Sequence, residues 1–122
     1  MIGKAWMMAA VLVAALPAAA QEVPQALREK TKVEGLLKGR TLEGTYLRTG
    51  SPYRLVFGAD GGLVNQEGAQ GRWWVDDQGQ YCREWTSGAL QGNRACLGVA
   101  QAVDGGIAFL HEGRKVAEGR LR

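Results

Sequence analysis

From residue 41 to the end of the chain, apolar and polar side chains alternate with a period of two. Glycine-rich turns interrupt this alternation roughly every 8–14 residues. Alternation of this kind is typical of short strands that have one face on a core and the other in solvent. The pattern predicts eight strands, at residues 41–48, 53–57, 63–66, 71–75, 80–85, 94–103, 107–111 and 115–121.

The connections between these strands have the chemistry of tight hairpins. Asp60-Gly61 and Asp104-Gly105 are examples, because glycine accepts the positive φ that such turns require. Consecutive strands joined by hairpins form an antiparallel meander. A small meander usually closes on itself, which removes exposed strand edges. We therefore predict a mainly β fold, a small barrel or strongly curled sheet of about 7–8 strands with one N-terminal helix.

A helical period precedes the strands, at residues 23–38. Its apolar residues fall on one stripe when the segment is wound at about 100° per residue. Gly39 suits the position just beyond a helix end. The charges on the other face are mixed in sign, which favours a helix packed on or across the sheet over a membrane-surface helix. The stripe consists of Val23, Ala26, Leu27, Val33 and Leu37.

The first twenty residues have the pattern of a cleavable signal peptide. Lys4 gives the positive start, residues 5–16 are apolar, and small residues precede a predicted cleavage between Ala20 and Gln21. The apolar run is too short to span a bilayer core of about 30 Å. We expect a periplasmic or secreted protein with no stable membrane insertion after cleavage. The predicted organisation is a signal peptide at 1–20, the helix and its lead-in at 21–40, and a β domain at 41–122.

Charge and composition narrow the class of partner. The chain has 15 basic and 12 acidic residues, a formal net charge of +3. The basic residues are scattered rather than clustered, so nucleic acid is not an expected partner. No sequence motif points to a cofactor.

The two cysteines predict a disulfide in an oxidising compartment. If the strands at 80–85 and 94–103 pair around their connecting loop, Cys82 faces Cys96 and Glu84 faces Arg94. The alternatives are free thiols or a metal site with His111. Two cysteines and one histidine leave a zinc site one ligand short, so no metal is predicted. The sequence does not show whether the facing residues form a hydrogen-bonded or a non-hydrogen-bonded pair.

Several spaced residues resemble a known family. Leu-x-Gly-x-Thr-Leu-x-Gly-Thr-Tyr at 37–46, Gly-Arg-Trp-Trp-Val at 71–75, Tyr81-Cys82 and Cys96 are similar to small exported proteobacterial proteins that form a domain of unknown function. The resemblance covers roughly residues 35–110. It implies a periplasmic β domain with one disulfide and no activity. The order of elements is also similar to lipocalin-like and avidin-like barrels and to small periplasmic protease inhibitors.

The aromatic residues suggest a binding surface. Trp73 and Trp74 are consecutive, so in a regular strand one faces inward and the other outward. An exposed Trp74 beside Arg72, Arg83 or Arg54 would anchor a protein or a flat ligand. The alternative is that the N-terminal helix covers Trp74.

His111 is the single histidine and the one candidate general base. No serine has a nucleophile-elbow context, and both cysteines are assigned to the disulfide. The sequence therefore favours a non-catalytic binding module for another envelope protein or a small apolar ligand. A hydrolase of unrecognised type that uses His111 is the alternative. Inward positions rich in leucine, valine and aromatics predict a filled barrel, which favours the protein partner.

Overall fold

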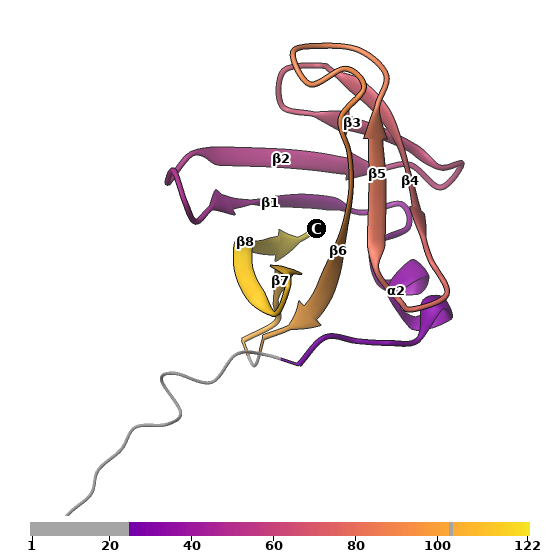
Figure 1. Cartoon of the computed structure of the whole chain (residues 1–122), viewed down its shortest axis with the longest axis vertical. Coiled ribbons are helices and arrows are strands. Elements are labelled where there is room, and N and C mark those ends of the chain that lie inside the picture. The colour runs from indigo at the N-terminus through magenta and orange to yellow at the C-terminus, as the bar shows by residue number, and fades with distance from the viewer. Residues whose placement is uncertain (1–24, 103) are drawn as a thin grey trace, which may run out of the picture.

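The computed structural model describes residues 25–102 and 104–122, in which eight strands follow one short helix (Figure 1). Each predicted strand is present, with ends that differ by at most two residues. The strands are β1 (Thr41–Tyr46), β2 (Pro52–Phe57), β3 (Gly62–Asn65), β4 (Gln70–Val75), β5 (Tyr81–Trp85), β6 (Arg94–Gln101), β7 (Gly106–His111) and β8 (Arg114–Leu121).

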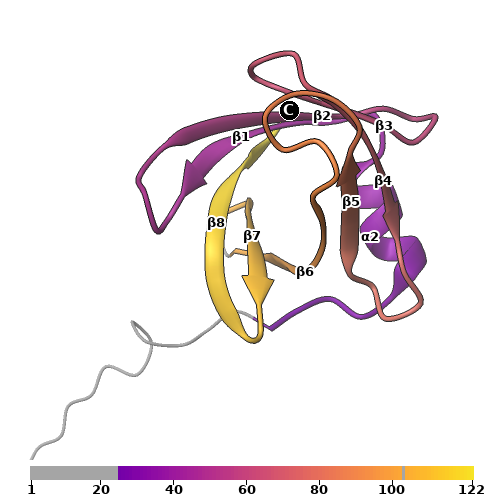
Figure 2. The same cartoon turned by 45° about the horizontal axis from the view of Figure 1, so that its top comes forward.

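Every strand pairs antiparallel with the next one along the chain, and β8 returns to pair with β1. The sheet is therefore a closed barrel, which confirms the predicted fold class. Figure 2 shows β8 running beside β1 to complete the wall. The β1–β8 seam begins at Thr41, whose N–H donates to the Arg122 carbonyl oxygen at 3.0 Å.

Two glycines face each other in the seam, Gly44 on β1 and Gly119 on β8. A Cβ at Gly44 would collide with the carbonyl oxygen of Glu118, and a Cβ at Gly119 would collide with that of Glu43. The two backbones therefore approach more closely here than any side chain allows. The first and last strands can close the barrel because neither residue has a side chain.

The helix α2 (Lys30–Leu37) is shorter than the predicted 23–38. Residues 25–29 are not helical. Within them, the Leu27 N–H donates to the carbonyl oxygen of Val99 on β6 at 2.7 Å. This hydrogen bond to the barrel forms where the sequence predicted the first helical turns. The tertiary contact therefore overrides the local preference for helix. Residues 23 and 24 lie outside the described part of the chain.

The helix closes one end of the barrel. Val33 and Leu37 of α2 are fully buried in the same cluster as the barrel interior. Gly39 follows the helix with φ +73, as the C-terminal signal predicted, and donates its N–H to the Phe57 carbonyl oxygen where β2 ends. In the same buried cluster, Phe57 packs edge-on against Trp73 and Tyr81. The core is therefore filled at the helix end.

Strands β5 and β6 pair in the predicted register. Cys82 faces Cys96, and the two form a disulfide with their Cα atoms 4.0 Å apart. The Trp85 N–H donates to the Asn93 carbonyl oxygen. Trp85 and Asn93 are therefore a hydrogen-bonded pair. The two pair types alternate along an antiparallel ladder, and Cys82 and Cys96 lie three pairs further along, so they form a non-hydrogen-bonded pair. The disulfide is confirmed, and its pair type is settled.

The predicted leader, with its cleavage point between Ala20 and Gln21, lies outside the described residues. Within residues 25–102 and 104–122, no helix has the length and apolar character needed to cross a membrane.

Candidate functional site

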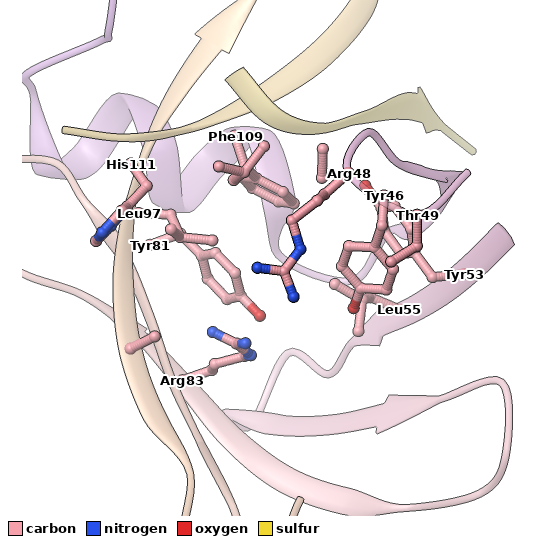
Figure 3. Close-up of a pocket in the computed structure, with 13 residues that line it drawn as sticks. Tyr46, Arg48, Thr49, Tyr53, Leu55, Tyr81, Arg83, Leu97, Phe109 and His111 are labelled. Atoms are coloured by element: carbon pink, nitrogen blue, oxygen red, sulfur yellow. The ribbon is translucent and has the colours of Figure 1, made fainter. Parts of the chain in front are cut away.

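A cavity of about 370 Å³ occupies the barrel end opposite α2 (Figure 3). This end, called the open end below, is where β1, β5 and β7 finish and where β2, β6 and β8 begin. Side chains from all six of these strands and from the β1–β2 connection reach the cavity. Its lining consists of Tyr46, Arg48, Thr49, Tyr53, Leu55, Tyr81, Arg83, Ala95, Leu97, Phe109, His111, Val116 and Ala117.

The strand pleat places these residues. Alternate side chains of a strand point to the same face of a sheet, and in a closed barrel that face is the interior. Tyr53 and Leu55 are buried on β2 while Arg54 between them is exposed. On β5, Tyr81 and Arg83 share the inward face. The expectation of a filled barrel holds at the helix end but is wrong at the open end, where small residues such as Ala95 and Ala117 leave space.

Aromatic rings form two walls of the cavity. Tyr46 and Tyr53 stack with ring centroids 4.5 Å apart. Tyr81 and Phe109 stack with centroids 5.0 Å apart. Such rings give an apolar ligand a large contact area and are already held in place.

Polar atoms without partners lie among these rings. The hydroxyls of Tyr53 and Tyr81 and the Nη1 atom of Arg83 are buried, and none has a hydrogen-bond partner within the described residues. Tyr53 is 4% exposed and Tyr81 is 1% exposed. A buried polar group left unpaired costs roughly 1–3 kcal/mol, and native proteins contain few of them. Three of the residues with such atoms line this one cavity.

Burial raises the pKa of the Tyr81 hydroxyl well above its ordinary value of 10.0, against a smaller opposing effect of the Arg83 charge. Burial also raises the pKa of the Tyr53 hydroxyl, and neighbouring Tyr46 and Glu118 act in the same direction. Both hydroxyls are therefore protonated at neutral pH, so each keeps a hydrogen to donate.

The charged residues that line the cavity are basic. Arg48 and Arg83 both point toward the hydroxyl of Tyr81 (Figure 3). His111 lies at the rim with its side chain 60% exposed, and its Nε2 atom is 3.5 Å from Oε1 of Glu112. In the described chain, no aspartate or glutamate lines the cavity.

The structure brings only part of the predicted surface together, since Arg72 lies two positions from Trp74 on the outward face of β4. Trp73 is the inward tryptophan, and Trp74 is the half-buried outward one. The guanidinium of Arg94 lies over the Trp74 ring, 4.9 Å from its centroid. Arg83 faces the barrel interior instead.

The other two arginines of that predicted surface lie on the outside of the barrel. Arg72 donates to Oε1 of Glu84 at 2.6 Å. Arg54 is exposed on β2, where its backbone N–H donates to Oε1 of Gln66. Arg72, Arg54 and Arg83 therefore do not surround Trp74 as one site.

One group of potential metal ligands gathers on the outer face. Asp76, Cys82 and Cys96 have ligand atoms within 4.8 Å of one another. Both sulfurs are joined in the disulfide, so they are not available as thiolate ligands.

Tyr53, Tyr81 and Arg48 line the cavity but are not among the site residues predicted from the sequence. The sequence did contain an indication of the cavity: Arg83 lies between Tyr81 and Trp85 on the inward face of the predicted strand that becomes β5. A charged residue at an inward position is rare without a partner. Arg48 gave the same indication, because in the predicted strand at 41–48 it shares a face with Leu42 and Tyr46, although in the structure it follows β1 in the β1–β2 connection.

No family model, curated protein or solved structure matches this chain. The resemblance to exported proteobacterial proteins and to lipocalin-like barrels therefore stays a prediction.

Proposed function

We propose that this protein is a non-catalytic binding module of the bacterial cell envelope that takes a small ligand into its open end. The observation that carries the proposal is the set of unpartnered polar atoms, from Tyr53, Tyr81 and Arg83, inside an otherwise aromatic cavity. Binding sites for small molecules typically combine apolar walls with a few convergent polar groups. The signal-peptide pattern supports export to the periplasm.

The cavity volume sets the size of the ligand. About 370 Å³ is at the low end of the range for small-molecule sites. At about 30 Å³ for each water-sized group, it holds about twelve non-hydrogen atoms. A fatty acid of medium length or a two-ring aromatic compound fits this size.

A binding role accounts for the site better than catalysis does. The two cysteine sulfurs are bonded to each other, so neither is a thiolate nucleophile. His111 stands exposed at the rim, beside Glu112. The buried groups of the site are hydrogen-bond donors that fix a ligand. The groups that hold a ligand are therefore deep in the cavity, where an envelope protein reaches them only by inserting a side chain.

The test is native mass spectrometry of the purified protein with a panel of anionic, neutral and cationic compounds of about twelve non-hydrogen atoms. We expect at least one compound to bind with one-to-one stoichiometry and to raise the melting temperature, because a ligand of the native state stabilises it. Ala95→Leu, which fills the cavity, should abolish both effects. Ala59→Leu is the matched control, since Ala59 is exposed in the β2–β3 turn. Absence of binding by the whole panel, or binding that Ala95→Leu leaves intact, would overturn the proposal.

A further inference from the structure

We propose that the ligand is a small amphiphilic carboxylic acid, whose carboxylate is bound by Arg83 with the hydroxyls of Tyr81 and Tyr53. This inference rests on the proposed function and names the chemical class of the ligand. Three properties of the cavity lead to it: its charge, its unpartnered donors and its apolar walls.

The arginines of the protein differ in their partners. Arg72, Arg120 and Arg122 lie on the outer surface, and each forms an ion pair with a carboxylate, from Glu84, Asp104 and Glu43 respectively. Within the described residues, Arg48 and Arg83 in the cavity form no ion pair and no side-chain hydrogen bond, and the same holds for the exposed Arg28, Arg54 and Arg114. Arg83 differs from the exposed arginines because its Nη1 atom is buried without a hydrogen-bond partner.

A buried guanidinium atom without a carboxylate is expensive, because the charge loses water and gains nothing in return. The Arg83 side chain is half-buried as a whole, and its Nη1 atom is in this position. An anionic ligand would supply the missing partner. A neutral ligand would supply a weaker one, and a cationic ligand would be repelled by both arginines. The charge of the cavity therefore selects an anion.

The polar groups of the cavity are hydrogen-bond donors. A guanidinium has only donors, and the protonated Tyr81 and Tyr53 hydroxyls are able to add one donor each. A carboxylate has two oxygens that accept several hydrogen bonds, and its planar geometry matches the fork of an arginine. Arg48, which comes from the β1–β2 connection, points toward the same place (Figure 3). It would approach the anion from the mouth of the cavity.

The rest of the cavity lining is apolar. The stacked rings of Tyr46 and Tyr53 and of Tyr81 and Phe109 are joined by Leu55, Leu97 and Val116. These apolar walls suit an alkyl chain or an aromatic ring. They provide few hydrogen-bonding partners for a sugar or for a second charged group. The ligand thus combines one anionic end with an apolar body. Free phosphate and sugar phosphates lack that body.

Isothermal titration calorimetry at neutral pH with three ligands of one chain length tests the proposal: decanoate, 1-decanol and decylamine. We expect decanoate to bind about tenfold or more tightly than decanol, since hydrogen bonds to charged groups are stronger than neutral ones. Decylamine should show no binding. 2-Naphthoate tests whether a flat body is accepted in place of a chain, and inorganic phosphate should not bind.

Arg83→Met keeps the length of the side chain and removes its charge. It should weaken decanoate binding by about 10- to 100-fold and leave decanol binding nearly unchanged. Arg54→Met is the matched control, because Arg54 is exposed on the outer face of β2 beside Tyr53. Tyr81→Phe provides a second variant, with a smaller loss expected. A melting temperature for each variant confirms that it folds.

The outcomes separate the two proposals. If decanol binds as tightly as decanoate and Arg83→Met changes neither, the carboxylate assignment is wrong while the ligand-binding function stands. If decylamine binds best, the inference that the cavity selects an anion is wrong, and the ligand-binding function again stands. If none of these compounds binds and the broader panel also fails, the proposed function fails too.

Discussion

At the scale of single residues, the main feature is a set of buried polar groups that have no hydrogen-bond partner among the residues the structure describes. Tyr53, Tyr81 and Arg83 sit at inward positions where an apolar residue would pack without penalty. Residues that oppose the stability of the free protein are common at functional sites, where they are kept for binding. Changing one of the tyrosines to phenylalanine should therefore weaken ligand binding and leave the free protein as stable or more so.

The two buried tyrosines predict a loss of stability in alkali. In the unfolded chain, Tyr53 and Tyr81 ionise near the ordinary pKa of 10.0, whereas burial raises the pKa of both hydroxyls in the folded protein. The unfolded state releases its protons first, so the free energy of unfolding falls as the pH rises above about 10. Below that pH these residues cause no change.

Urea unfolding measured at pH 8 and pH 11 tests this prediction. The wild-type protein should lose more stability between the two pH values than the double variant Tyr53→Phe/Tyr81→Phe. Both proteins share the same lysines, so the comparison isolates the hydroxyls. Equal losses would contradict the burial of the two phenols.

At the scale of elements, the β5–β6 hairpin shows which features the sequence alone was able to predict. The facing of Cys82 with Cys96 and of Glu84 with Arg94 follows from alternation and from the position of the loop, and the structure has both pairs. The extent of α2 did not follow. Its predicted first turns form a hydrogen bond to β6 instead, and that contact joins segments more than seventy residues apart.

The disulfide should contribute about 3 kcal/mol to the free energy of unfolding, which is the chain-entropy estimate for a loop of this length. The cysteines are separated by 14 positions. Urea denaturation of Cys82→Ala/Cys96→Ala should show a loss of about that size. A reducing agent should lower the stability of the wild type toward that of the variant and leave the variant unchanged. A reducing agent that has no effect on the wild type would show that the bond contributes little.

Replacing each of two glycines by alanine should change the stability of the protein in opposite directions. Gly44→Ala should destabilise the protein by about 1–3 kcal/mol, the usual range for an overpacked site, because the added methyl meets the backbone of β8. Gly35 lies exposed in α2 with open space around it. Gly35→Ala should therefore stabilise the protein by about 0.5–1 kcal/mol. Thermal and urea unfolding of both variants check this, and a tolerated Gly44→Ala would show that the seam is looser than described.

At the scale of the whole molecule, the closed barrel followed from the pattern while the cavity did not. Alternation and turn chemistry assign each residue to one face of the sheet. They do not give the volume that remains when inward side chains meet. At the open end, Ala95 and Ala117 lie among the large rings of Tyr53, Tyr81 and Phe109, and only the assembled structure shows that these leave a space.

The seam between the first and last strands also bears on behaviour in concentrated solution. A second copy of the chain presents the same β8 edge to β1, so two molecules that exchange their last strands satisfy the same pairings as one. The exchange requires the β7–β8 turn to extend, and Glu112 in that turn has φ 51, a conformation that is uncommon for a non-glycine residue and that extension of the turn would relieve. Strand-exchanged dimers are therefore the associated form that refolding at high protein concentration should yield.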